Sequence, residues 1–371
     1  MLHESWRTRA TVAICMCLGR RLLITCCSGT RTGIANHTKG CTPNVRALVT
    51  GVTGFTGGHL AHHLLRHGYH VRGLVRCESL GRTATLTDSG VEVVQGDLTV
   101  PASLEAACQG VDVVFHIAAT YRTAGHGSST YHSVNVVGTE HLLEAALSAR
   151  VRRVVHCSTG GVHGHIEHPP ANEDAPLSPG DIYQCTKLKA EQYAGRFGAN
   201  NDIEVVIARP IGIYGPGDTR FLKMFRLARG RIPLLGDGQV FYHLTFIDDL
   251  VDGLRRCGES PAAVGRTYLL AGSEYTTLKE LMSLIATELG ASPPRWHFPV
   301  WPVWVLGALC EFVCVPFKIE PPLYRRRVDF FIKSRAFDTT RARRELLFSP
   351  GTTLRDGIRK TADWYSEQGL L

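Results

Sequence analysis

Paired cysteines are absent from this chain. None of its 12 cysteines forms a Cys-x-x-Cys pair, five of them fall before residue 45, and the others are scattered along the remainder. In a chain of 371 residues this distribution argues against a disulfide framework. It predicts reduced thiols, so the expected location is a reducing compartment, the cytoplasm.

Long apolar runs are missing as well. The most apolar segment, Trp296 to Phe317, contains an uninterrupted run of only 13 residues, from Phe298 to Cys310. A helix needs about 20 apolar residues to cross a bilayer, so this run is too short to span one. Two interpretations remain: a helix that lines an apolar substrate pocket, or a peripheral membrane contact assisted by Arg325-Arg326-Arg327.

Acidic residues are scarce near the N-terminus. Residues 1–44 hold six Lys or Arg and one Glu, so they carry +5 of the formal charge of +8, and the rest of the chain carries only +3. That small excess argues against a nucleic-acid partner. Arg20-Arg21 interrupts the short apolar run of this segment, unlike the core of a signal peptide. We expect a basic, non-core extension at 1–44; the alternatives are an organellar targeting segment and translation that starts near Val45.

What the chain does contain is a glycine turn between a strand and a helix. The apolar, β-branched run Val45 to Val49 predicts a buried strand, and Gly51, Gly54 and Gly57 follow it, directly before a helical pattern. Gly51 permits a tight turn, Gly54 lets a ligand phosphate approach the backbone, and Gly57 lets the helix pack close to the strand. The turn therefore predicts a site for a dinucleotide pyrophosphate.

Strand and helix patterns alternate regularly after this turn. The predicted strands are Tyr69–Val75, Val91–Val94, Val111–Ala119, Arg153–Ser158 and Ile203–Ala208, and the predicted helices are Pro101–Gln109, Asn135–Ala149 and Asp181–Gly198. This alternation predicts an α/β fold with a doubly wound parallel (Rossmann) sheet. Beyond Pro210 the pattern loosens. We expect a dinucleotide-binding domain at 45–210, which also takes in about 241–260, and a smaller C-terminal substrate-binding region mainly within 211–371.

Arg76 ends the second predicted strand. An acidic residue at this place binds the adenosine ribose hydroxyls of NAD, whereas an arginine suits the 2′-phosphate of NADP. The sequence therefore favours NADP over NAD as cofactor.

Tyr183 and Lys187 lie four residues apart in the first turns of a predicted helix, so they share one face. A phenol with a pKa near ~10 is a poor acid or base at neutral pH, but a neighbouring ammonium favours its ionised form. Ser158 and Thr159 end a predicted strand and could hold a substrate oxygen beside the tyrosine. Together with the glycine turn, these residues predict a site for proton and hydride transfer.

The motifs together resemble the extended short-chain dehydrogenases/reductases, in the NAD-dependent epimerase/dehydratase group. The matching pieces are TGVTGFTG from Thr50, GDL from Gly96, HIAA from His116, NVVGT from Asn135, STGGVHG from Ser158, YQCTK from Tyr183, RPIGIYGPGD from Arg209, FIDDL from Phe246, and RARRELLFSP with Trp364-Tyr365. The resemblance runs from about residue 45 to the end in the family's order, and it implies an NAD(P)-dependent enzyme that transfers a hydride between nicotinamide and a secondary alcohol or ketone.

The resemblance also implies roles for single residues. Tyr183 would be the general acid/base, Lys187 would hold the ribose and lower the tyrosine pKa, and Thr159, or else Ser158, would hold the substrate oxygen. Cofactor contacts are implied for Gly51, Thr53, Gly54, Phe55, Thr56, Gly57, Arg76, Asp97, Leu98, Ala118, Ala119, Asn135, Tyr183, Lys187 and Pro210. Substrate contacts are implied for Thr120, Tyr121, Gly160, His163, Ile213 and Tyr214.

Two departures from the family's patterns narrow the reaction. Gly160-Gly161 stand where sugar-nucleotide dehydratases carry an Asp-Glu pair, so the acid and base of elimination are missing and dehydration is not the expected reaction. Tyr242-His243 stand where epimerases often carry an Arg-Asp whose arginine binds a diphosphate. This second departure, with the apolar segment Trp296 to Phe317, favours a weakly charged or apolar substrate and the branch that resembles 3β-hydroxysteroid dehydrogenases and dihydroflavonol reductases.

Several alternatives stay open from the sequence. Arg220, Arg231 or the arginines at 325–327 could still bind a phosphate, which keeps a nucleotide-sugar epimerase with tightly bound NAD as the second hypothesis. A non-catalytic NAD(P)-binding protein is the third. The resemblance implies no metal, although His163, His165 and His168 lie close together in sequence, and a homodimer formed through the helices at 135–149 and 181–198 is compatible with it.

Overall fold

The computed structural model describes residues 45–121, 127–230, 233–294, 296–314, 328 and 331–371. The predictions for the extension at 1–44, for Arg231, for Arg325-Arg326-Arg327 and for the last three residues of the 296–317 segment lie outside the described residues. The described residues belong to one compact unit.

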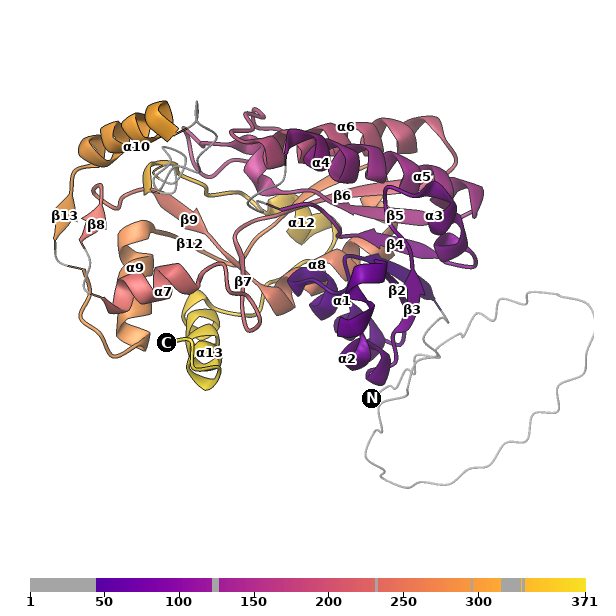
Figure 1. The fold of residues 1–371 in the computed structure, drawn as a ribbon, viewed down its shortest axis with the longest axis horizontal. Helices are drawn as coiled ribbons and strands as arrows, with labels where there is room; N and C mark the ends of the chain where they lie inside the picture. The colour runs from indigo at the N-terminus through magenta and orange to yellow at the C-terminus, as the bar shows by residue number, and fades with distance from the viewer. Residues whose placement is uncertain (1–44, 122–126, 231–232, 295, 315–327, 329–330) are drawn as a thin grey trace, which may run out of the picture. The chain divides into compact units, whose positions relative to one another are not determined.

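A seven-stranded parallel sheet forms the centre of this unit, in the order β11-β6-β5-β4-β1-β2-β3 (Figure 1). Its strands are β1 (Arg46–Thr50), β2 (His70–Val75), β3 (Glu92–Gln95), β4 (Val113–His116), β5 (Arg153–Cys157), β6 (Glu204–Pro210) and β11 (Thr267–Leu270). The predicted doubly wound α/β class is confirmed, and the six strands expected from the sequence are present. The seventh, β11, lies in the part that we had assigned to the substrate-binding region.

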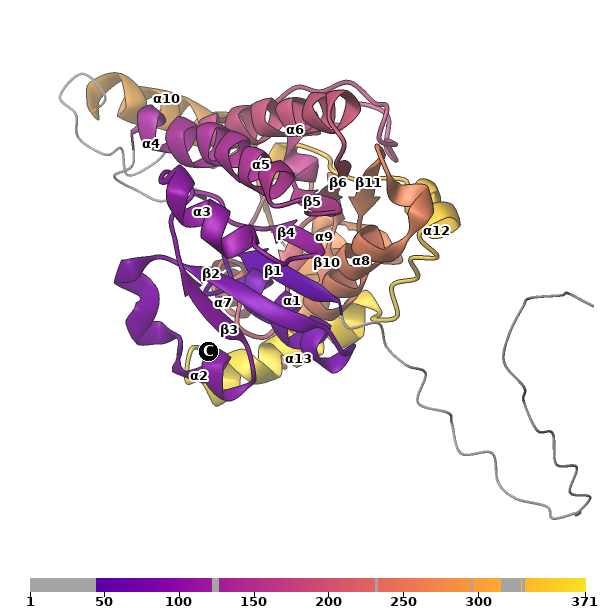
Figure 2. The ribbon, with the colours of Figure 1, turned by 90° about the vertical axis from the view of Figure 1, so that its right-hand side faces the viewer.

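Helices cover both faces of the sheet (Figure 2). On one face α1 (Phe55–Arg66) packs against α8 (Ile247–Glu259), and on the other α3 (Pro101–Cys108), α5 (Gly138–Ser148) and α6 (Ile182–Asn200) lie side by side. Two buried apolar clusters correspond to these two layers. The inner strands β1, β4, β5 and β6 are almost wholly buried, because helices cover both of their faces, and they are mainly apolar. The edge strand β3 is not buried.

The remaining chain forms short ribbons and helices beside the sheet. The ribbons pair β7 (Ile213–Tyr214) with β10 (Thr245–Phe246), β9 (Phe241–His243) with β12 (Tyr275–Thr277), and β8 (Leu234–Leu235) with β13 (His297–Phe298). The helices are α2 (Ala84–Asp88), α4 (Ser128–His132), α7 (Leu222–Arg229), α9 (Leu278–Glu288), α10 (Val300–Cys314), α12 (Thr340–Glu345) and α13 (Leu354–Glu367).

Helix α10 is apolar and largely exposed. Figure 1 places it beyond β8 and β13, at the opposite end of the unit from β2 and β3. Trp301 is 70% exposed and Phe312 is 79% exposed, and Gly307 is the helix's buried residue. Among the described residues, no helix has the length and apolar character needed to cross a membrane.

Strand order reverses between β1 and β4, which lie side by side although two strands and three α-helices separate them in sequence. A buried polar chain ties their ends together. The backbone N–H groups of Ile117 and Ala118 donate to Thr50 Oγ1 at 3.1 Å, Thr50 contacts His116 Nδ1 at 2.9 Å, and His116 Nε2 contacts Thr139 Oγ1 at 2.9 Å. Burial lowers the pKa of His116 to about 3, so its ring is neutral. The loops that leave β1 and β4 therefore start from fixed positions at the reversal point, where ligands bind in sheets of this kind.

Candidate active site

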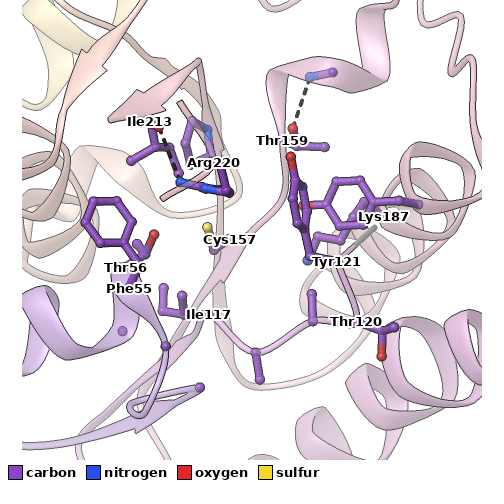
Figure 3. Close-up of a pocket in the computed structure, with 18 of the residues that line it drawn as sticks. Phe55, Thr56, Ile117, Thr120, Tyr121, Cys157, Thr159, Lys187, Ile213 and Arg220 are labelled. Atoms are coloured by element: carbon purple, nitrogen blue, oxygen red, sulfur yellow. Dashed lines mark hydrogen bonds between the residues drawn. The ribbon is translucent and has the colours of Figure 1, made fainter. Parts of the chain in front are cut away.

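A cleft of about 1260 Å³ follows the carboxyl ends of the parallel strands (Figure 3). All the predicted site residues line it except Asn135, His163 and Tyr214. The loops after β1, β4, β5 and β6 contribute one part of the lining. Helix α7 and residues of the C-terminal region contribute the part that would face a substrate.

The glycine turn has the backbone geometry that its sequence predicts. Gly51 has φ +71°, which an L-residue rarely adopts, and a Cβ at Gly57 would lie 2.2 Å from the carbonyl oxygen of Gly51. Helix α1 begins directly after Gly54, with no acidic residue in its first turn. A closely packed, glycine-only cradle at a helix N-terminus fits the pyrophosphate of a dinucleotide.

The strand ends beyond this turn would face the adenosine. Arg76 follows β2, lines the cleft and makes an exposed ion pair with Glu78 at 2.8 Å. Asp97 follows β3, and its Oδ1 accepts hydrogen bonds from the backbone N–H and hydroxyl of Thr99, both at 2.7 Å. These bonds fix the Asp97 loop, while Arg76 stays at the surface.

Tyr183 and Lys187 project from the first turns of α6, which Asp181 caps by accepting a hydrogen bond from the Gln184 N–H at 2.9 Å. Lys187 is only 1% exposed although it lines the cleft. Burial lowers the pKa of its ammonium group, while Cys157 and Glu191 oppose this shift. The ring of Tyr121, from the loop after β4, packs edge-on against Tyr183 with centroids 4.9 Å apart. In Figure 3, Tyr121, Thr159 and Lys187 lie together on one side of the cleft, across from Phe55 and Thr56.

The two adjacent hydroxyls at the end of β5 differ in their partners. Ser158 is buried, and its Oγ donates to Glu191 Oε2 at 2.5 Å; Glu191 in turn pairs with the buried Arg209. Thr159 is half-buried, and its Oγ1 accepts a hydrogen bond from the Gly161 N–H at 3.1 Å. Since the Thr159 oxygen is the acceptor in that bond, its hydroxyl proton can be donated to a group in the cleft.

Three residues predicted as ligand contacts lie outside the cleft lining. Asn135, in a π-helical turn at Ser133–Val137, is buried and bonds both backbone groups of Thr120, at 2.7 and 3.2 Å. His163 is buried against Arg209 at 3.0 Å, and Tyr214 is part of the apolar core. Both the oxygen and the nitrogen of the Asn135 amide bond this loop, so Asn135 holds the loop after β4 in place.

Further residues line the cleft beyond those of the motifs, and one of them is Arg220, which the sequence left open as a phosphate ligand. Arg220, from the turn before α7, pairs with the buried Asp218 through Nε at 2.7 Å. Its guanidinium also lies 5.5 Å from the ring centroids of both Phe55 and Tyr121, so it bridges the two sides (Figure 3). The remaining lining near α7 and the C-terminal region is mostly apolar: Phe221, Met224, Leu227, Leu244, Phe331 and Phe337.

One group of potential metal ligands occurs among the described residues, and it is not in the cleft. His63 and His67 on α1 and Asp252 on α8 place their ligand atoms within 4.8 Å of one another. Asp252 already accepts hydrogen bonds from Arg255 and Arg256, and the positive charge of these two arginines opposes the binding of a metal cation. Of the two histidines, His63 is buried.

Comparison with known families agrees with this geometry. The model of the NAD dependent epimerase/dehydratase family matches residues 47–271, which run from β1 to just past β11. The chain therefore belongs to the NAD-dependent epimerase/dehydratase family, and it is an enzyme of the extended short-chain dehydrogenase type.

Relatives within the family differ in reaction. The chain is 30% identical to 3beta-hydroxysteroid-dehydrogenase/decarboxylase isoform 1 of Arabidopsis thaliana over 352 residues, covering 86% of this chain and 79% of that protein. It is 31% identical to UDP-glucose 4-epimerase of Mycolicibacterium smegmatis over 338 residues, covering 86% and 98%. Among solved structures, UDP-glucuronic acid 4-epimerase from Bacillus cereus in complex with NAD superposes with a TM-score of 0.70 at 25% identity, covering 87% and 99%.

Proposed function

We propose that the protein is an NAD(P)-dependent oxidoreductase that interconverts a secondary alcohol and a ketone on a largely apolar substrate. The observation that supports this most directly is the position of Tyr183, Lys187 and Thr159 in one cleft with the glycine turn. The apolar side chains near α7 and the C-terminal region supply a surface on which an apolar substrate body can pack.

Each of these residues has a separate role in the proposed reaction. Nicotinamide dinucleotide supplies hydride exchange when it is bound. Tyr183 exchanges a proton with the substrate oxygen, and Thr159 donates a hydrogen bond to the same oxygen and orients it. Lys187 holds positive charge close to the phenol, and the buried cleft strengthens that attraction relative to water. Tyr121 packs against the Tyr183 ring and limits its rotation.

Tyr183→Phe tests this assignment because it removes the phenolic oxygen and keeps the ring. Loss of the acid/base group should lower kcat about 10²- to 10⁴-fold. Tyr193→Phe is the matched control, since Tyr193 lies on the same helix and does not line the cleft. NAD(P)H absorbance with a panel of hydroxysteroids and ketones measures the effect; a Tyr183→Phe variant with wild-type kcat would contradict the proposal.

The preference for NADP is part of the proposal and rests on Arg76. Its exposed guanidinium pairs with Glu78, a partner that a 2′-phosphate can replace at little cost. Arg76→Gln should raise KM for NADPH and leave KM for NADH nearly unchanged. Equal effects on both cofactors would remove the basis for this preference.

Epimerisation of a nucleotide sugar is the second candidate, favoured by the relative from Mycolicibacterium smegmatis. An epimerase returns the hydride to the same substrate, so it keeps its cofactor bound and shows no net redox change. Native mass spectrometry of the purified protein, together with isomer exchange on UDP-glucose without release of NADH, separates the two candidates.

We also propose that α10 contacts a lipid surface. Its exposed apolar side chains include two tryptophans, and the sequence that follows carries three consecutive arginines suited to anionic headgroups. The helix is too short to span a bilayer, so the contact would be peripheral.

A further inference from the structure

Arg335 differs from the other arginines that line the cleft, Arg76 and Arg220, which each pair with an acidic residue. It lines the cleft with Phe331 and Phe337 as near neighbours in sequence, and its Nε is buried without a hydrogen-bond partner. No residue that the structure describes makes a side-chain hydrogen bond or ion pair with it. Arg220, by contrast, is neutralised by Asp218.

The backbone of Arg335 is held firmly. Its N–H donates to the carbonyl of Phe241 at 2.8 Å, and the Ala336 carbonyl accepts from the Ala171 N–H at 3.0 Å. The segment is extended, so alternate side chains point to opposite sides: Ala336 is buried, while Arg335 and Phe337 both reach the cleft. The guanidinium is therefore aimed into the substrate end by the fold and is not a mobile surface group.

An isolated parallel bridge pairs Arg335 with Tyr242. Tyr242 occupies the position at which epimerases resembling this chain often carry their diphosphate-gripping arginine. Burial raises the pKa of the Tyr242 phenol, and the charge of Arg335 opposes that rise, which reflects how close the two groups are. Strand β9 thus has Tyr242 in place of that arginine, while Arg335, on the segment paired with β9, carries a positive charge.

The buried Nε–H of Arg335 is costly to leave without an acceptor, because nothing replaces the water that it loses. An oxyanion would compensate it with short, charge-assisted hydrogen bonds, and the planar fork of arginine matches carboxylate and phosphate oxygens. The surrounding aromatic and aliphatic side chains suit the rest of such a molecule.

We infer that Arg335 is the oxyanion-binding residue of the substrate site, so that the substrate combines an apolar body with a carboxylate or phosphate group. The inference deepens the proposed function and rests on it for the identity of the substrate end. It adds one anionic group to the weakly charged or apolar substrate that Tyr242-His243 and the apolar segment Trp296 to Phe317 favour.

Arg335→Met and Arg335→Lys test the inference by direct binding. Calorimetry with NADH-saturated protein would use three probes: 3-hydroxymyristate, its methyl ester, and UDP. Arg335→Met should weaken the binding of an anionic probe about 10- to 100-fold and leave the ester unchanged, and Arg335→Lys should recover part of the loss. Loss confined to 3-hydroxymyristate identifies a carboxylate, and loss confined to UDP identifies a phosphate.

Arg343→Met is the matched control, since Arg343 is an arginine of the same region that does not line the cleft. The inference is overturned if wild type binds the ester as tightly as the acid and does not bind UDP, or if Arg335→Met binds every probe like wild type. Binding is measured without turnover, so these results are independent of Tyr183→Phe. A catalytically silent protein with Arg335-dependent anion binding would reject the proposed reaction and keep this subsite.

Discussion

Ser158 and Thr159 should respond in opposite ways to loss of their hydroxyls. Ser158→Ala removes a buried hydrogen bond to the ionised Glu191, whereas Thr159→Val removes a bond to a neutral backbone N–H. Hydrogen bonds to charged groups contribute about 1.5–3 kcal/mol, and neutral ones about 1 kcal/mol. Arg209 continues to bond both oxygens of Glu191, so the cost of Ser158→Ala should fall near the lower end, about 1.5–2 kcal/mol.

The activities should show the reverse order. Ser158 donates away from the cleft, so Ser158→Ala should keep kcat within about threefold of wild type, a change of less than 1 kcal/mol in the activation barrier. Thr159→Val removes a donor aimed at the reacting oxygen, which should lower kcat about 10²- to 10³-fold. Thr159→Ser keeps the hydroxyl and is the control that should remain active.

Urea unfolding and steady-state NAD(P)H absorbance measure the two quantities on the same preparations. The reasoning predicts a stability loss that is larger for Ser158→Ala and an activity loss that is larger for Thr159→Val. It is refuted if Ser158→Ala loses activity more than tenfold while Thr159→Val retains wild-type kcat.

Three further sets of substitutions extend these tests. Gly57→Ala should abolish dinucleotide binding in a fluorescence titration, because its Cβ would lie 2.2 Å from the Gly51 carbonyl; Gly195→Ala, whose Cβ would meet nothing within 4 Å, should bind normally. Lys187→Met should raise the free energy of unfolding at neutral pH while removing activity. Burial lowers the pKa of this lysine below its usual 10.5, so the charged form opposes folding at low pH, and the gain should shrink as the pH rises toward 10.5; a destabilised variant at neutral pH would contradict this. Replacing Trp301 and Phe312 with serine should abolish cosedimentation with anionic lipid vesicles; vesicle binding equal to wild type, or a dimer that dissociates in the variant, would instead reject a lipid contact for α10.

The features predicted most accurately from the sequence are those that depend on residues close together in the chain. The glycine turn, the first six strands and the Tyr183/Lys187 pair each lie within a short window with a regular pattern. The seventh strand, β11, was missed because it follows the region beyond Pro210 in which the alternation of strands and helices loosens. Its place in the sheet comes from pairing with β6, about 60 residues earlier.

Other features of the site depend on partners far away in the sequence. The family resemblance preferred Thr159 to Ser158, but the buried Glu191–Arg209 pair that binds Ser158 is visible only in the structure. Asn135 belongs to a recognisable motif, yet its amide is used by the loop at Thr120. Arg335 reaches the cleft through a bridge to Tyr242, which no local pattern indicates.

The return of the chain to the sheet has a consequence for how the protein can fold during synthesis. Helix α8 packs against α1, and β11 closes the edge of the sheet beside β6. Both come later in the chain than helix α7 and strand β9, which border the substrate end of the cleft. A nascent chain that ends at Pro210 has no α8 over α1 and an open β6 edge, so the cofactor-binding half cannot be completed before the first substrate-facing segments are made. Those segments are held at both ends by the sheet, which lets their loops vary in evolution without releasing the strands that hold the dinucleotide.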